Sequence, residues 1–220
     1  MGQGLTVRDV QCTRAGRIIF SGMSFAAMPG DVVQVRGSNG SGKSSLLRLL
    51  CGLLQPTRGD VRWCGQSIGP IPSESLGSIA YMGHASGMSG ELTVLENLRF
   101  SLHVANSAFA QTECREVLGR LGLARRSDTC VRFLSQGQQQ RLSLARVILS
   151  RRPLWLLDEP SASLDEEGEE LFDEYLSEHA RGGRIAVVAT HRDLGDGPGA
   201  LSIDMDAFGD AGSLDSVHHP

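Results

Sequence analysis

Lysine is almost absent from this 220-residue sequence: of 21 basic residues only Lys43 is a lysine, and the others are arginines. Apolar runs long enough to span a membrane are also lacking, as is an N-terminal charged segment followed by an apolar one, so we expect a cytosolic chain. Basic residues are not in excess. The net charge of −4 argues against a nucleic-acid interface built on bulk basicity, and we expect no nucleic-acid partner.

Closely paired cysteines are missing as well. The five cysteines show no C-x-x-C spacing, which excludes the usual zinc and disulfide patterns, and no C-x-x-C-H sequence for heme attachment is present. We expect these thiols to be small buried side chains in a reducing compartment. The content of 40% hydrophobic and 21% charged residues is ordinary for one globular domain.

The strongest motif lies at residues 37–44, where GSNGSGKS fits the phosphate-binding pattern G-x-x-x-x-G-K-[ST]. An apolar run at 32–35 precedes it, and leucines at helical spacing follow from Leu46, so the strand–loop–helix context is present. The alternative, a Gly/Ser-rich turn before an amphipathic helix, does not account for that context. We expect ATP to be held by this loop and the helix start, at Gly37, Ser38, Asn39, Gly40, Ser41, Gly42, Lys43, Ser44 and Ser45.

Lys43 and Ser44 have separate roles in this pattern. The ammonium of Lys43 would reach the β- and γ-phosphates, and the Ser44 hydroxyl would ligate Mg²⁺. A compact ammonium enters a ring of backbone amides that a planar guanidinium would overfill. The chain therefore uses arginine everywhere except where arginine would not fit.

Strands and helices alternate along the chain. We predict strands within residues 5–36, at 60–63 and at 78–82, then two buried strands at 153–157 and 184–189 that flank a helix. From about 85 to 150 the pattern is helical, with capping boxes at Thr93/Glu96 and Ser135/Gln138. We predict an α/β fold of the P-loop NTPase class: a mostly parallel sheet, an N-terminal antiparallel β subdomain and an inserted helical subdomain. Residues 1–204 would form one domain, and 205–220 a short, loose tail.

Acidic and histidine side chains follow the two buried strands. Asp158 and Glu159 come at the end of one strand, and His191 follows the other, so all three would lie at the carboxyl edge of the sheet where ligands bind. Asp158 would hold Mg²⁺, and Glu159 would orient and deprotonate the attacking water. We expect His191 to contact the γ-phosphate. An Asp-Glu pair alone would as readily cap a helix, and the upstream phosphate loop favours the catalytic interpretation.

Residues 134–141, LSQGQQQR, resemble the signature LSGGQ of ABC-type ATPases, with Gln136 in place of a glycine. The resemblance covers Leu5 to about Asp204. It implies that Ser135, Gln136, Gly137 and Gln138 bind the γ-phosphate of ATP held by a second copy, in a head-to-tail nucleotide sandwich. A helix N-terminus suits that anion. The resemblance also implies that residues 163–165 connect the two sites.

Two further positions follow from the same resemblance. His84 stands where a glutamine usually reaches toward Mg²⁺ and couples the site to a membrane partner, which implies a metal contact there. Arg14 stands where an aromatic residue usually stacks on adenine, and a guanidinium plane can also stack on a base.

The combination of these motifs with Gly83-His84 and LTVLENL at 92–98 is similar to the CcmA family, the ATPase subunits of bacterial cytochrome c maturation exporters. This implies an ATPase at the cytoplasmic face of the inner membrane that powers integral membrane subunits of the heme-exporter type. Heme itself would be handled by those partners, not by this chain. We expect an exposed apolar patch near residues 87–92 for docking.

Three alternatives remain open. The chain would otherwise be the ATPase of another ABC exporter, a soluble ABC-type ATPase acting on nucleic acid or ribosomes, or a small-molecule kinase. The second class usually carries two nucleotide domains or long coiled insertions, and the third needs a lid and an acceptor pocket.

Overall fold

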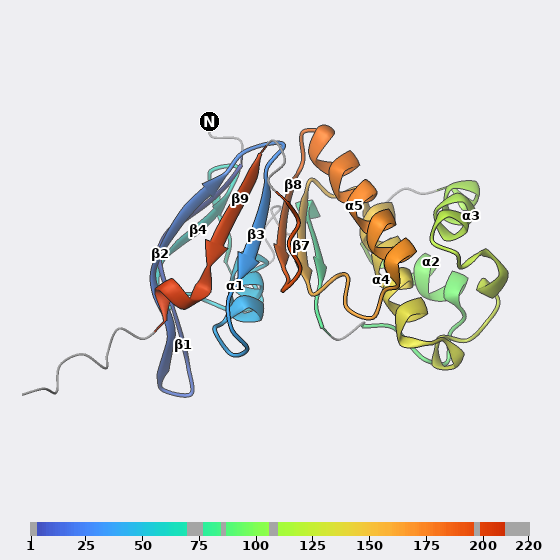
Figure 1. Cartoon of the computed structure of the whole chain (residues 1–220), viewed down its shortest axis with the longest axis horizontal. Helices are drawn as coiled ribbons and strands as arrows, with labels where there is room; N and C mark the ends of the chain where they lie inside the picture. The colour runs from blue at the N-terminus through green and yellow to red at the C-terminus, as the bar shows by residue number, and fades with distance from the viewer. Residues whose placement is uncertain (1–3, 70–76, 85–86, 106–109, 196–198, 210–220) are drawn as a thin grey trace, which may run out of the picture.

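The computed structural model describes residues 4–69, 77–84, 87–105, 110–195 and 199–209. Two sheets form its framework (Figure 1). The antiparallel sheet has the order β2-β1-β4-β5, with β1 at Leu5–Arg14, β2 at Arg17–Ala27, β4 at Arg58–Trp63 and β5 at Gln66–Ser67. The parallel sheet has the order β6-β7-β8-β3-β9, with β6 at Ile79–Met82, β7 at Leu154–Asp158, β8 at Ile185–Ala189, β3 at Val32–Arg36 and β9 at Ala200–Asp204.

Helices cover the parallel sheet, and the helical part of the chain extends to one side of it, away from the antiparallel sheet (Figure 1). Their bounds are Lys43–Leu50 for α1, Val94–Val104 for α2, Gln111–Arg120 for α3, Gln136–Ser150 for α4 and Glu166–Arg181 for α5, with short 3-10 turns at Ala124–Arg126 (η2), Val131–Phe133 (η3) and Met205–Phe208 (η4). The predicted α/β class with a parallel sheet, an antiparallel N-terminal sheet and a helical portion is confirmed. No helix of the described residues combines the length and apolar character needed to cross a membrane.

Strands β7 and β8 are buried along their whole length, as their continuous apolar sequences predict. Because side chains alternate along a strand, Leu154 and Leu156 enter the core shared with α1 and the antiparallel sheet. Trp155 and Leu157 enter a second core with α2, α4 and α5. These strands therefore hold a fixed position between two packed layers, and so do the residues at their ends.

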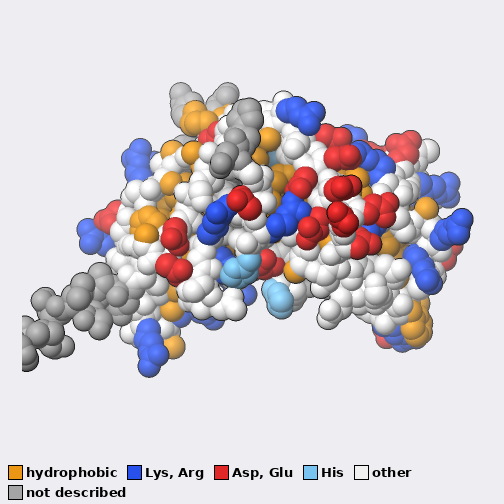
Figure 2. Space-filling view, in the orientation of Figure 1, with side chains coloured by type: hydrophobic (Ala, Val, Ile, Leu, Met, Phe, Trp, Pro, Cys, Tyr) orange, Lys and Arg blue, Asp and Glu red, His pale blue; other side chains and the backbone are white. Residues whose placement is uncertain are grey.

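Both predicted capping boxes are present. Thr93 Oγ1 accepts from the Glu96 backbone N–H at 3.2 Å, and the Glu96 carboxylate accepts from the Thr93 N–H at 2.8 Å. Ser135 and Gln138 make the same exchange at the start of α4. Helix α5 has three acidic residues in its first turn, which suit the positive end of a helix dipole. Acidic side chains gather on the surface over α5 (Figure 2).

Several local expectations differ from the structure. The apolar runs at 18–20 and 23–27 belong to one strand, β2, whose pairing with β1 has shifts in register. Helix α1 ends at Leu50, and Leu53 beyond it is 68% exposed. Strand β9 and η4 were not predicted, because ALSID lacks a run of large apolar residues. The 205–220 tail thus begins in an ordered turn, and its part after Gly209 lies outside the described residues.

The prediction of an exposed apolar patch near residues 87–92 was wrong. Met88 and Leu92 are half-buried, because buried Asn97 binds this segment to α2. The Asn97 amide donates to the carbonyls of Ser89 at 2.9 Å and Leu92 at 3.1 Å, and its oxygen accepts from the Ser89 N–H. Among the described residues of this region, the exposed large apolar side chains include Phe100 and Val104, one turn apart on α2, and Phe133 in η3.

His179 on α5 makes the stability of this fold depend on pH. Its ring stacks on Trp155 with centroids 3.7 Å apart, and Nε2 lies 3.1 Å from the Ile185 carbonyl oxygen. Burial lowers the pKa of His179 from 6.5 to about 4, so the folded chain holds the neutral ring. The unfolded chain binds a proton near pH 6.5, so the stability present above that pH is lost as pH falls toward about 4.

We therefore expect His179 to account for a loss of about 2 kcal/mol in unfolding free energy between pH 7 and pH 5. Urea unfolding of the parental chain and of His179→Phe at the two pH values measures the part of the stability loss that is due to His179. Phenylalanine keeps the stack on Trp155 but does not titrate, so the variant should lose about 2 kcal/mol less. Equal losses in both chains would show that His179 does not carry the effect.

Candidate nucleotide site

The phosphate loop lies between β3 and α1, and its glycines have conformations that other residues rarely adopt. Gly37, Gly40 and Gly42 have φ values of 140°, 88° and 104°. A Cβ on Gly42 would lie 2.7 Å from Ile19 Cγ2 and 2.9 Å from Phe20 Cδ1, so strand β2 presses directly on the start of α1. Glycine is thus required here both for backbone conformation and for close packing.

Lys43, the single lysine, is only 8% exposed at the first position of α1. Its ammonium donates to the carbonyl oxygens of Gly37 at 2.8 Å and Ser38 at 3.2 Å, and lies 3.4 Å from His191 Nε2. The positive charge is therefore held inside the loop by oxygens of the same turn.

Strands β7 and β8 bring three predicted residues to this loop, because neighbouring parallel strands end at one edge of the sheet. Asp158 is the last residue of β7, and Glu159 follows with φ 49° and its N–H bonded to the Ala189 oxygen at 2.8 Å. His191 Nε2 lies 3.6 Å from Glu159 Oε1 and 3.2 Å from Asn39 Oδ1. A non-glycine residue at positive φ is strained, and such strain is common at functional sites.

Asp158 has the environment of a cation ligand. It is 4% exposed, and its Oδ2 has no hydrogen-bond partner among the described residues. A buried carboxylate oxygen without a partner is costly unless a cation or water fills the place. Within the described chain no group of three His, Cys, Asp or Glu could hold a metal, so the site offers few protein ligands. Mg²⁺ is commonly held in that way, by one or two protein oxygens with phosphate and water.

A cavity of about 520 Å³ joins these residues. Predicted site residues make up most of its lining: Arg14, Asn39, Gly40, Gly42, Lys43, Ser44, Ser45, His84, Asp158, Glu159 and His191. Ile19 and Ala162 complete it and were not predicted. Ile19 lies in an ordinary strand pattern, so no sequence signal separated it from its neighbours.

The signature segment contacts the residues that follow strand β7. Gln140 Nε2 donates to the carbonyl oxygens of Glu159 and Pro160, both at 2.9 Å, a role that sequence reasoning missed. A Cβ on Gly137 would lie 2.7 Å from the Ser163 oxygen, which explains the glycine kept there. Gln136, the departure from the usual glycine, is exposed and needs no such space.

Ser135 opens on a second cavity, of about 310 Å³. Its lining is Gly122, Ser135, Gly137, Gln138, Arg141, Ser163 and Asp165, and it shares no residue with the first cavity. Arg141 and Asp165 form an ion pair there that ties α4 to the start of α5. Within one chain, therefore, the phosphate loop and the signature serine belong to separate sites.

A phosphate loop beside strand-end carboxylates, with a separate capped signature helix, defines an ATP-binding domain of the ABC class. The family model described as ABC transporter matches residues 20–162. The chain belongs to the ABC transporter family and, within it, to the CcmA family of ATP-binding subunits. Its family hydrolyses ATP in support of transport.

Curated relatives place the chain in that group. The cytochrome c biogenesis ATP-binding export protein CcmA of Cupriavidus pinatubonensis is 45% identical over 203 residues, covering 92% of this chain and 90% of the relative. The protein of the same description from Bordetella bronchiseptica is 48% identical over 185 residues, covering 83% and 82%.

Solved structures confirm the fold. An ABC transporter ATP-binding protein from Pyrococcus furiosus matches with a TM-score of 0.83 at 19% identity, covering 94% of this chain and all of that one. The ATP-binding cassette MJ0796, solved as a dimer in a post-hydrolysis state with ADP and phosphate, matches with a TM-score of 0.76 at 24% identity, covering 90% and 96%.

Proposed function

We propose that two copies of this chain close on two ATP molecules and that hydrolysis reopens them to drive membrane subunits of a cytochrome c biogenesis exporter. The observation that carries the proposal is the separation of the two cavities, since neither contains both the phosphate loop and Ser135. A second copy placed head to tail would supply the missing serine and helix N-terminus to each ATP.

The phosphate loop would hold the triphosphate through its amides and through Lys43, whose ammonium would exchange its contacts to Gly37 and Ser38 for phosphate oxygens. The Ser44 hydroxyl and the unpartnered oxygen of Asp158 would hold Mg²⁺. The bound cation would neutralise charge that develops on the transferring phosphoryl group. Arg14 would stack on the base, and His84 would lie beside the metal through water.

Glu159 would orient and deprotonate the attacking water, and its partly buried carboxylate in the cavity lining, next to Asp158 and near His191, supports that role. His191 Nε2 lies 3.6 Å from that carboxylate, and His191 would donate to the γ-phosphate. Positioning and charge stabilisation supply most of the catalysis in this chemistry.

Dependence of the ATPase rate on protein concentration tests the two-copy arrangement. If the site needs a second chain, specific activity should rise with concentration until dimers dominate. A specific activity that stays constant from the most dilute measurable sample upward would contradict it, provided the sample is shown to be monomeric there.

The membrane partner would dock beside α2. A cavity of about 550 Å³ lies there between β6, α2 and α4, and its lining includes Val104, Arg146 and Arg152. Val104 is 68% exposed on its rim, and Phe100 one turn earlier is 63% exposed. An exposed apolar pair beside arginines fits a partner segment with apolar and acidic side chains. Docking there would hold the chain at the cytoplasmic face of the inner membrane.

Val104→Asp should reduce recovery of the membrane subunits with this chain by about tenfold or more, because an unpaired charge would be buried at the contact. The measurement is copurification from detergent-solubilised membranes of the native cell. Leu53→Asp is the matched control, since Leu53 is also 68% exposed but lies outside this cavity. Equal recovery with both variants would exclude α2 as the docking surface.

A further inference from the structure

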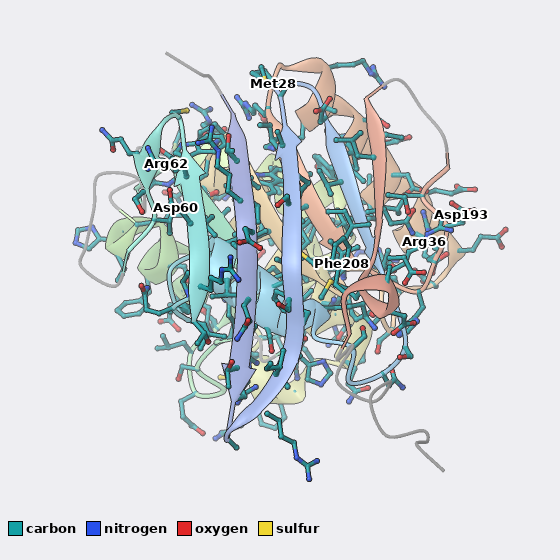
Figure 3. The ribbon with its side chains drawn as sticks, turned by 90° about the vertical axis from the view of Figure 1, so that its left-hand side faces the viewer. Met28, Arg36, Asp60, Arg62, Asp193 and Phe208 are labelled. Carbon is teal, nitrogen blue, oxygen red and sulfur yellow. The ribbon has the colours of Figure 1, made fainter. Side chains whose placement is uncertain are left out.

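The segment after β9 packs against the first residue of the phosphate loop. Met205, in η4, is fully buried, and a Cβ on Gly37 would lie 2.9 Å from Met205 Cβ. Phe208 at the end of η4 packs on the core beneath the antiparallel sheet, where it is seen beside β9 (Figure 3). The chain thus returns to the phosphate loop almost 170 residues after leaving it.

Asp206 in this turn binds the loop directly. Its Oδ2 accepts from the Ser38 backbone N–H at 2.9 Å, and its Oδ1 accepts from the Ser38 hydroxyl at 2.7 Å. These two bonds hold the pKa of Asp206 below its ordinary value, and the charge of Lys43 adds to the effect. The backbone of this turn is held as well, because the Asp206 N–H donates to Asp204 Oδ1 at 3.0 Å.

Ser38 is consequently held from two sides. Its N–H and hydroxyl donate to Asp206, while its carbonyl oxygen accepts from Lys43 Nζ at 3.2 Å. When ATP draws Lys43 toward the phosphates, the bonds to Asp206 remain to fix the turn. A loop with three glycines at positive φ has much conformational freedom to lose, so an external anchor lowers the cost of ordering it.

We propose that Asp206 is a positioning residue for ATP binding, which keeps the Ser38 turn ordered in the empty chain so that the loop amides already converge on the triphosphate. The anchor is not part of the phosphate-loop motif and lies beyond the segment matched by the family model. The proposal relies on the proposed function, ATP binding at this loop. The ATP affinity of the parental chain tests that function separately.

The kinetic consequence differs from that of a catalytic group. Without the anchor, the loop must become ordered when ATP binds, and this ordering costs part of the binding free energy. The cost raises the free energies of the ATP complex and of the transition state equally, relative to the free chain. Asp206→Ala should therefore weaken ATP binding and raise KM by about three- to tenfold, as expected for one or two charge-assisted hydrogen bonds at an exposed site. The turnover number at saturating ATP should stay within about twofold.

Titration calorimetry with Mg²⁺-ATP on chains that also carry Glu159→Gln measures the affinity, and steady-state hydrolysis without that substitution separates KM from kcat. Asp206→Asn should lie between the parental chain and Asp206→Ala, because the amide oxygen can still accept one bond from Ser38. In a Ser38→Ala background, the effect of Asp206→Ala should shrink.

Asp60→Asn is the matched control. The Asp60 carboxylate also accepts from a serine hydroxyl, that of Ser67 at 2.8 Å, but it lies on β4, across the view from Phe208 (Figure 3). This variant should bind ATP as the parental chain does. ATP binding that is unchanged or tighter in Asp206→Ala would overturn the proposal, as would a fall in kcat without a rise in KM. Failure of the parental chain to bind ATP would instead contradict the function itself.

Discussion

Replacing Glu159 with glutamine should lower the rate of ATP hydrolysis by about 10²- to 10⁴-fold, the range for loss of a general base. The amide has the same shape as the carboxylate but cannot accept the proton of water. The backbone at Glu159 is fixed by the bond to Ala189 and by the amide of Gln140, so the substitution leaves the cavity in place. ATP binding should therefore survive.

The same variant should accumulate as a dimer with bound ATP, because closure no longer leads to hydrolysis. Size-exclusion chromatography with and without Mg²⁺-ATP, together with single-turnover hydrolysis, measures both effects. Glu167→Gln on the exposed surface of α5 serves as the control and should hydrolyse ATP at the parental rate. Parental hydrolysis by Glu159→Gln would show that another group activates the water.

Lys43→Arg should weaken ATP binding by about a hundredfold or more, although the charge is kept, since disrupting a buried charged contact costs roughly 2–5 kcal/mol. Lys43 is buried and reaches two carbonyl oxygens of the loop with a single ammonium. A guanidinium is a larger planar fork and cannot occupy that position without displacing the loop. Calorimetric titration with Mg²⁺-ATP measures the loss.

Arg58→Lys is the control for Lys43→Arg, because it makes the reverse exchange in an exposed ion pair with Asp9. It should leave ATP binding unchanged, as surface ion pairs contribute little. If Lys43→Arg binds ATP with parental affinity while remaining folded, the fit of the single lysine to the loop is not the reason for its presence.

Sequence periodicity predicted the parts of the site that local patterns encode. The glycine spacing indicated the loop, and the apolar runs of the buried strands β7 and β8 indicated that Asp158, Glu159 and His191 lie at one edge of the sheet. Both capping boxes could be predicted because the paired residues are three positions apart.

What sequence reasoning missed depends on contacts between distant segments. Nothing in the sequence around Asp206 indicates that its carboxylate meets Ser38, and the short strand β9 that carries it there lacks a run of large apolar residues. Gln140 likewise belongs to a helix whose sequence gives no sign of a bond to Glu159. The patch expected at 87–92 failed because one buried amide, Asn97, draws that segment inward.

The most direct test of the central claim is a structure of the Glu159→Gln chain with Mg²⁺-ATP. Two chains should enclose two nucleotides, each with its terminal phosphates between Lys43 of one chain and Ser135 of the other. A triphosphate bound away from Lys43, or enclosed without Ser135 of a second chain, would contradict the account.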